Sequence, residues 1–149
     1  MNPILGRFVE PIYALFRIVV GFTFSLHGAQ KLFGAFGGAG GDGQPVPLMS
    51  LMGLAGVIEF GCGLLVLIGL FTSLAAFIAS GQMAVAYFMA HFPHGVLPIV
   101  NHGESAVLFC FIFLYISARG SGIWSVDQAL GRGTRPAAGF APTGPAGRP

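Results

Sequence analysis

Four apolar stretches dominate the chain, and each is long enough to form a helix that crosses a lipid bilayer. They run over about residues 11–33, 48–71, 73–92 and 101–118. A spanning helix needs about 20 mostly apolar residues. The very short gap between the second and third stretches predicts a tight antiparallel hairpin. We therefore predict an all-α fold, an integral membrane four-helix bundle over residues 1–130.

The composition supports a membrane environment. Hydrophobic residues make up 54% of the chain, charged residues make up 8%, and the mean hydropathy is +0.80. A soluble domain carries about 25% charged residues, so we expect this chain to be surrounded by lipid. Its basic residues form no patch interleaved with aromatic residues, which argues against a nucleic-acid partner. The first stretch contains Arg17 and lacks a small-residue cleavage site, so we expect it to be retained.

The segments outside the four stretches are small and polar. "GAFGGAGGDGQPVP" (34–47) lacks the Lys-Ser/Thr pair of a phosphate-binding loop and is expected to be a flexible linker. In "GSGIWSVDQAL", Trp124 is placed for the membrane interface, and Ser125 and Gln128 form a capping-box pattern. We predict a short interfacial helix there. The Gly/Pro/Ala-rich tail (131–149) is expected to be disordered.

The distribution of basic residues predicts the orientation. Arginines flank the bundle at both chain ends, with Arg7 before the first stretch and Arg119, Arg132, Arg135 and Arg148 after the fourth. Cytoplasmic segments carry the excess of Lys and Arg, and an even number of helices returns the chain to the same side. We predict a multi-pass protein of the inner (plasma) membrane with both termini cytoplasmic. Lys31, at the outer end of the first stretch, runs against this rule.

Polar side chains recur inside the apolar stretches. Arg17, His27 and Lys31 fall within an arc of about 80° on the first helix, and Gln30 lies beside them. An ionisable group at the centre of a membrane helix costs about 2.5–3.5 kcal/mol. This stripe is therefore expected to face the interior of the bundle.

The other stretches carry polar groups at matching depth, which predicts a polar pocket in the outer half of the bundle. We assign His27 and Glu59 as candidate catalytic residues. The remaining candidates, expected to line the pocket, are Arg17, Gln30, Lys31, Gln82, Tyr87, His91 and Glu104. No metal site is expected. Cys62 and Cys110 lie far apart inside apolar runs and are interpreted as small hydrophobic residues.

Several of these residues also have a purely structural interpretation. Arg17 and Glu59 would then form a buried pair that fixes helix register, and Lys31 would extend to the outer interface. Glu104 would complete a capping box with Asn101. Tyr87 would belong to the core or to the interfacial aromatic belt, and the loop histidines His94 and His102 would be solvated. His27 and Glu59 lie well inside the membrane and away from helix caps, so they lack such an explanation.

These residues resemble the DoxX family of small bacterial four-helix membrane proteins. The likeness rests on "HGAQKLFG" from His27, "EFGCG" from Glu59, "HGESAVL" from His102 and "GSGIWSVD" from Gly120, and it covers about residues 11–130. The resemblance implies a link to the membrane subunit of thiosulfate:quinone oxidoreductase, which hands electrons to quinone. Other members are tied to thiol and oxidative stress, or to quinone and catechol detoxification.

Three functions remain open from the sequence. The resemblance favours a quinone-interacting redox subunit, with quinone as the cofactor, working as an oligomer or complex subunit. Electrons would arrive from a soluble partner protein or from a bound haem, because the chain has no C-x-x-C pair and no flavin fingerprint. A b-type haem is the less favoured carrier, since it needs histidines at similar depth on facing helices. The alternatives are a small-solute or proton carrier and a non-catalytic membrane anchor or scaffold.

Overall fold

The computed structural model describes residues 4–132, which form helices and no strand. The four long helices are α1 (Val9–Phe33), α2 (Leu51–Ile68), α3 (Thr72–Ala86) and α5 (Glu104–Arg119). Shorter turns are η1 (Gly6–Phe8), η2 (Ala35–Gly37), η3 (Tyr87–His91), η4 (Phe92–His94), α4 (Pro98–Asn101) and α6 (Val126–Ala129). The prediction of an all-α fold is confirmed.

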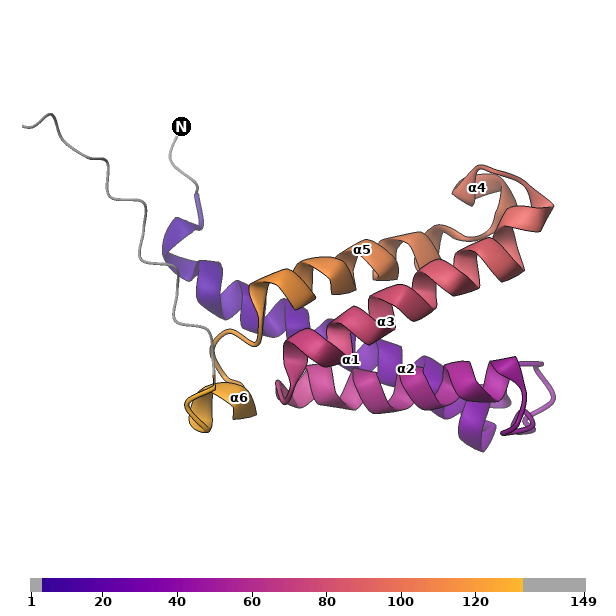
Figure 1. Cartoon of the computed structure of the whole chain (residues 1–149), viewed down its shortest axis with the longest axis horizontal. Helices are drawn as coiled ribbons and strands as arrows, with labels where there is room; N and C mark the ends of the chain where they lie inside the picture. Colours follow the sequence, from indigo (N-terminus) through magenta and orange to yellow (C-terminus); the bar gives the residue numbers. More distant parts are fainter. Residues whose placement is uncertain (1–3, 133–149) are drawn as a thin grey trace, which may run out of the picture.

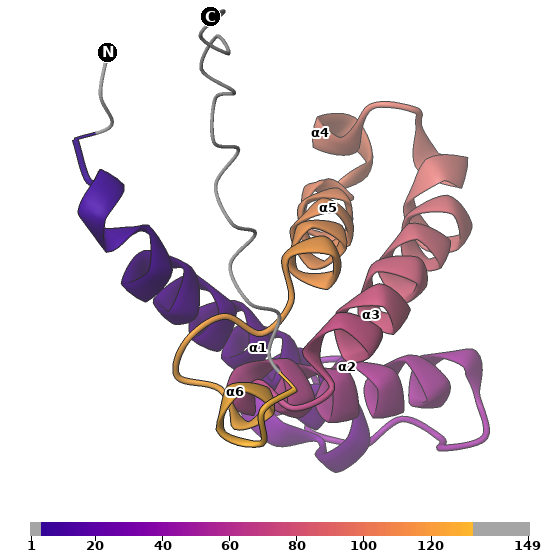
Figure 2. The ribbon, with the colours of Figure 1, turned by 60° about the vertical axis from the view of Figure 1, so that its left-hand side comes forward.

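The long helices form two antiparallel pairs. α1 packs along α2, α3 packs along α5, and the pairs meet mainly through α2 and α3. They converge where α2 turns into α3 and diverge towards the other end (Figures 1 and 2). We call the end that holds the α2–α3 turn, the start of α1, the end of α5 and α6 the closed end. The opposite end, with the loop 34–50 and α4, is the open end.

Three helical segments of the described chain are long and apolar enough to cross a membrane. They are Gly6–Phe33, Leu51–Ile68 and Thr72–His94. Lipid-facing positions on them are apolar and exposed, such as Phe22 on α1, Val57 on α2 and Phe77 on α3. The chain is a membrane protein.

The fourth predicted stretch is divided. The sequence suggests one helix over 101–118, but α4 ends at Asn101 and α5 begins at Glu104. His102 interrupts the helix because its backbone is left-handed, with φ of 56°. α5 keeps 16 residues, a length of about 24 Å.

The other helix boundaries have local causes. α2 begins at Leu51 because the Ser50 Oγ accepts a hydrogen bond from the Gly53 amide at 3.0 Å. α2 ends before Gly69, which has φ of 73°. α3 continues into the π-helical turn η3, so the predicted helix over 73–92 is α-helical only to Ala86.

The Gly-rich segment 34–50 folds back on α1. The Val46 amide donates to the Lys31 carbonyl at 2.8 Å, and the Gly43 amide donates to the Gly37 carbonyl at 2.7 Å. The predicted short helix after α5 is confirmed as α6, where the Ser125 Oγ accepts from the Gln128 amide at 3.2 Å. The predicted disordered tail, 131–149, lies outside the described residues except for its first two positions.

Glycines let α1 and α2 approach to backbone contact. A Cβ added at Gly21 would lie 2.7 Å from the Gly63 carbonyl oxygen, and one at Gly63 would lie 2.6 Å from the Ser25 amide nitrogen. Small residues at such interfaces are the usual means by which membrane helices pack closely. Gly61, on the same helix as Gly63, faces outward, and a Cβ there would meet nothing within 4 Å.

This contact predicts unequal effects of two otherwise similar substitutions. Gly63→Leu should lower the free energy of unfolding by about 2 kcal/mol or more, because its side chain would force the two backbones apart. Gly61→Leu on the same helix should have little effect, since its side chain would extend into lipid. Thermal unfolding of both variants in mild detergent measures the difference. Equal midpoints would contradict the packing described here.

α1 and α5 meet through large aromatic side chains. Phe24 lies against Phe113 with ring centroids 4.6 Å apart and against Phe109 at 5.4 Å. α3, which packs along α5, contributes small residues to this core, and its Ala76 and Ala79 are fully buried. These contacts form the core between the two helix pairs.

Arg17 closes the bundle at the closed end. Its side chain is fully buried, and Nη1 donates to the carbonyls of Val66 at 2.5 Å and Leu67 at 2.7 Å. Nη2 donates to the Trp124 carbonyl at 2.8 Å. A helix leaves its last carbonyls without intrahelical partners, and Arg17 supplies partners near the end of α2. The predicted Arg17–Glu59 pair is therefore wrong.

Asp127 fixes the start of α3 from a distant part of the chain. Its Oδ1 accepts from the Phe71 amide at 3.0 Å, and its Oδ2 accepts from the Thr72 amide at 3.1 Å. A carboxylate at a helix N-terminus satisfies free amides and interacts favourably with the helix dipole. The "GSGIWSVD" segment thus ties α6 to both helix pairs.

Candidate functional site

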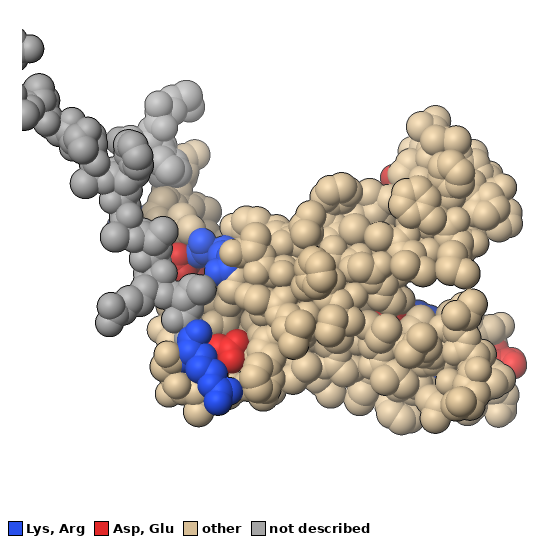
Figure 3. All heavy atoms as spheres, in the orientation of Figure 1, with Lys and Arg blue, Asp and Glu red and all other residues tan. Residues whose placement is uncertain are grey.

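A cleft of about 230 Å³ opens between the two helix pairs at the open end. Figure 3 shows a notch at this end, with basic and acidic atoms visible inside it. All four long helices contribute to the lining, which consists of Phe24, His27, Lys31, Met52, Ala55, Glu59, Gln82, Met83, Ala86, Ala90, His91, Ser105, Ala106 and Phe109. Apolar walls with a few convergent polar groups are typical of small-ligand sites.

Glu59 is held by donors from two other helices. Only 2% of the residue is exposed, and its Oε2 forms an ion pair with the Lys31 ammonium. Its Oε1 accepts a hydrogen bond from the Gln82 amide nitrogen at 3.1 Å. Both carboxylate oxygens are thus bonded, by α1 on one side and by α3 on the other. The alternative in which Lys31 only extends to the outer interface is not observed, because its ammonium pairs with Glu59 in the cleft.

His27 lies one turn before Lys31 on the same face of α1. Its ring meets the Phe109 ring edge to face, with centroids 6.1 Å apart. Neither of its ring nitrogens has a hydrogen-bond partner within residues 4–132. The residue is exposed, its ring is oriented by packing against Phe109, and its nitrogens are accessible to a ligand in the cleft.

His91 lines the cleft from the π-helical turn η3. Its Nδ1 lies 3.1 Å from the Asn101 carbonyl, which can only accept, so Nδ1 carries the proton. In the neutral ring this leaves a lone pair on Nε2. Tyr87 stacks on His91, and its hydroxyl donates to the Val96 carbonyl at 2.7 Å. Tyr87 thus supports the turn that carries His91.

The cleft brings together five of the nine predicted site residues: His27, Lys31, Glu59, Gln82 and His91. The other four, Arg17, Gln30, Tyr87 and Glu104, are not part of its lining. Glu104 is exposed at the start of α5. The alternative in which Glu104 completes a capping box with Asn101 is not observed either, because the Asn101 Oδ1 accepts from the Gly103 amide at 2.8 Å.

Sequence reasoning missed the aromatic and small residues of the cleft walls. Phe24, Phe109 and Ala106 lie in continuous apolar runs, so nothing in the pattern separates them from lipid-facing neighbours. One signal could have identified them: each is a small or aromatic residue that lies within about one helical turn of a polar residue of the cleft. For example, Phe24 lies three residues before His27.

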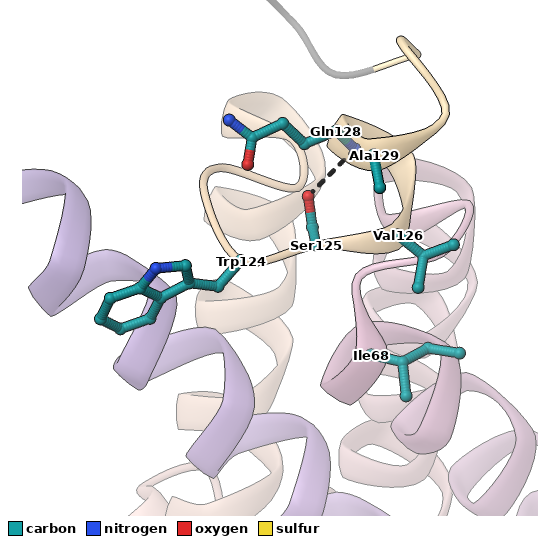
Figure 4. A pocket seen from close by; sticks show the side chains of 6 residues that line it. All are labelled: Ile68, Trp124, Ser125, Val126, Gln128 and Ala129. Carbon is teal, nitrogen blue, oxygen red and sulfur yellow. Dashed lines mark hydrogen bonds between the residues drawn. The ribbon is translucent and has the colours of Figure 1, made fainter.

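A second, shallower hollow lies at the closed end (Figure 4). It measures about 430 Å³ and is lined by Ile68, Trp124, Ser125, Val126, Gln128 and Ala129. Figure 4 shows the Trp124 indole pointing away from α6, and the residue is 59% exposed. No titratable side chain lines this hollow. We therefore place the candidate site in the cleft at the open end.

The charges in the cleft cancel. Lys31 and Glu59 form a pair, and the remaining polar groups are two imidazoles, an amide and a hydroxyl. Within residues 4–132, three or more His, Cys, Asp or Glu side chains do not gather as they would to hold a metal ion. The arrangement suits an uncharged ligand with polar atoms on an apolar frame.

The comparisons with known proteins agree with the sequence motifs. A family model described as DoxX matches residues 12–92, more than half of the chain. A protein of Haemophilus influenzae, named as an uncharacterized protein, is 41% identical over 131 residues, which cover 83% of this chain and 94% of that protein. No solved structure matches the chain at a significant level. His27, Lys31, Glu59, Gln82 and His91 all fall within the matched range.

Proposed function

Since the chain belongs to the DoxX family of membrane proteins, we propose that it is a quinone-interacting membrane subunit of a redox system. The cleft at the open end is the proposed quinone site. One observation carries the proposal: the paired Glu59 and the unpartnered His27 face the same apolar-walled cavity inside the membrane domain. Ionisable groups in such positions commonly mark ligand or proton sites.

The residues of the cleft fit the chemistry of a quinone. A quinone accepts two electrons and two protons, and its two carbonyl oxygens need hydrogen-bond donors. His27 can donate from a ring nitrogen, and Lys31 has further ammonium protons beyond the one shared with Glu59. His91 can accept a proton at Nε2, because its Nδ1 proton is directed at the Asn101 carbonyl. Phe24 and Phe109 offer apolar surface to the ring.

Electrons are proposed to arrive from a soluble partner protein, because the sequence contains no C-x-x-C pair. The proposed topology has both termini in the cytoplasm. In support, the start of α1 and the end of α5 lie together, where the Tyr13 hydroxyl donates to the Gly120 carbonyl at 2.5 Å. Arg7 and Arg119 lie at this closed end, as expected for a cytoplasmic face.

The test is whether the purified protein retains quinone through its cleft. Protein extracted in mild detergent should contain close to one quinone per chain, measured by mass spectrometry. Glu59→Gln should lose most of it, because the change removes the charge that holds Lys31. His27→Ala should lose the quinone as well, because the change removes the imidazole N–H that would bond a quinone oxygen. Circular dichroism and gel filtration establish that both variants are folded.

Glu104→Gln provides the matched control. It makes the same chemical change as Glu59→Gln at an exposed carboxylate outside the cleft lining, so it should keep its quinone. Absence of quinone from every folded sample would contradict the proposal. The carrier and scaffold hypotheses would then take its place.

A further inference from the structure

We propose, resting on the quinone function above, that the cleft accepts a quinone of one ring and excludes one of two fused rings. Phe109 is the residue proposed to set this limit. The inference comes from the volume of the cleft and from the way its aromatic wall is braced.

The cleft is small for a ligand site. Its volume is about 230 Å³, whereas sites for drug-sized molecules measure about 300–1,000 Å³. An engineered apolar cavity of about 150 Å³ holds one benzene ring. The cleft therefore has room for a single ring with its two oxygens and one small substituent. A second fused ring would need space that the side chains now fill.

The aromatic wall cannot retreat to make that space. Phe109 stacks on Phe113 with centroids 5.8 Å apart, and Phe113 is fully buried. Phe24, only 1% exposed, packs against both rings. Cores are close-packed, so displacing one of these rings would shift the other two.

The opposite wall is equally fixed. Glu59 is bonded to Lys31 and Gln82, which belong to different helices. A shift of Glu59 away from the ligand would break an ion pair and a hydrogen bond together. Ala55 and Ala106 have no rotatable side chain that could fold away. At these two positions the wall of the cleft is therefore formed by the backbone and by single methyl groups.

Phe109 is the wall residue best placed to act on ring size. It contacts the His27 ring directly, so a ligand oxygen bonded to His27 would bring the ligand ring beside Phe109. Truncating Phe109 would extend the cleft at this point while leaving Lys31, Glu59 and Gln82 in place. Ring-size preference should therefore depend on this side chain more than on the polar groups.

The experiment compares two probes on the full-length protein in mild detergent, freed of native quinone. 2-Methyl-1,4-benzoquinone represents one ring, and 2-methyl-1,4-naphthoquinone, which differs from it only by the fused second ring, represents two. Calorimetric titration of the wild type should show at least about tenfold tighter binding of the one-ring probe, as a volume mismatch in a packed site implies. Phe109→Ala should bind both probes with similar affinity.

Phe111→Ala is the matched control. Phe111 lies on the same helix, is 66% exposed and is not part of the cleft lining, so its loss should leave the preference unchanged. Phe109→Leu, which keeps more of the core contact, serves if the alanine variant fails to fold. Phe109→Leu should reduce the preference for the one-ring probe without abolishing it.

The outcomes separate the two proposals. Equal binding of the probes by the wild type, or tighter binding of the two-ring probe, would overturn the ring-size inference and leave the quinone function standing. An unchanged preference in folded Phe109→Ala or Phe109→Leu would overturn the role of Phe109. Failure of the wild type to bind either probe would overturn the quinone function together with this inference.

Discussion

Replacing Arg17 with methionine should lower the free energy of unfolding of the bundle by about 3 kcal/mol or more. Methionine keeps much of the side-chain volume but removes the hydrogen bonds to the carbonyls of Val66, Leu67 and Trp124. Hydrogen bonds from charged groups contribute about 1.5–3 kcal/mol each, and a buried carbonyl without a partner adds a desolvation cost. Chemical unfolding in mild detergent measures the change.

Arg7→Met is the matched control for Arg17→Met. Arg7 is exposed at the closed end and lies over the Phe8 ring, 4.6 Å from its centroid. Its loss should change stability by less than about 0.5 kcal/mol, as is usual for surface positions. Comparable losses in the two variants would show that Arg17 does not hold the closed end together.

The Lys31–Glu59 pair should show strong thermodynamic coupling. Glu59→Gln alone should destabilise the protein by about 2–3 kcal/mol, because it leaves the Lys31 ammonium without its counter-ion. Adding Lys31→Met should cost less than it does in the wild type, since the unpaired charge is removed. We expect a coupling energy of about 1.5 kcal/mol or more from the double-mutant cycle.

The cycle between Arg17 and Glu59 is the comparison that identifies the correct partner. These residues share no hydrogen bond, and Arg17 binds backbone carbonyls at the closed end. Their effects should therefore add to within about 0.5 kcal/mol. Strong coupling of Arg17 with Glu59, together with weak coupling of Lys31 with Glu59, would restore the pairing that the sequence suggested.

The sequence predicts the helices well because hydrophobicity over about 20 residues is a strong signal. It places α1 within two residues at each end. It fails at α5, where the break depends on the left-handed backbone of His102. Histidine adopts this conformation more often than most other side chains do, but the great majority of histidines do not, so its presence alone does not mark a break. A pattern of apolar and polar residues does not contain this information.

The site is predicted in part. The polar stripe on α1 and the depth of Glu59 predict a polar pocket, because ionisable groups in a membrane helix are expected to face the bundle interior. His27, Lys31 and Glu59 line the cleft, whereas Arg17 does not. The sequence does not identify the partners of Arg17 and Glu59, because these depend on two details of packing. The close approach of α1 and α2, where a Cβ on Gly56 would lie 3.0 Å from the Lys31 Cβ, brings Lys31 to Glu59. The segment after α5 returns to the closed end and supplies the Trp124 carbonyl to Arg17.

The cleft walls are beyond sequence reasoning for a different reason. Phe109 and Phe111 are both phenylalanines in one apolar helix, yet one lines the cleft and the other is exposed. Their faces differ by about 200° around the helix axis. Which face meets the neighbouring helices depends on how the two pairs diverge, and that is a property of the packed structure.

Covalent labelling of the protein with a photoreactive quinone tests the central claim most directly. The labelled sites are mapped by mass spectrometry, with excess unmodified quinone as competitor. We expect the competitor to suppress labelling of two segments that are far apart in sequence, residues 24–31 of α1 and 105–109 of α5. Labelling confined to lipid-facing positions such as Phe22 and Phe77, with no effect of the competitor, would contradict the assignment of the cleft as a quinone site.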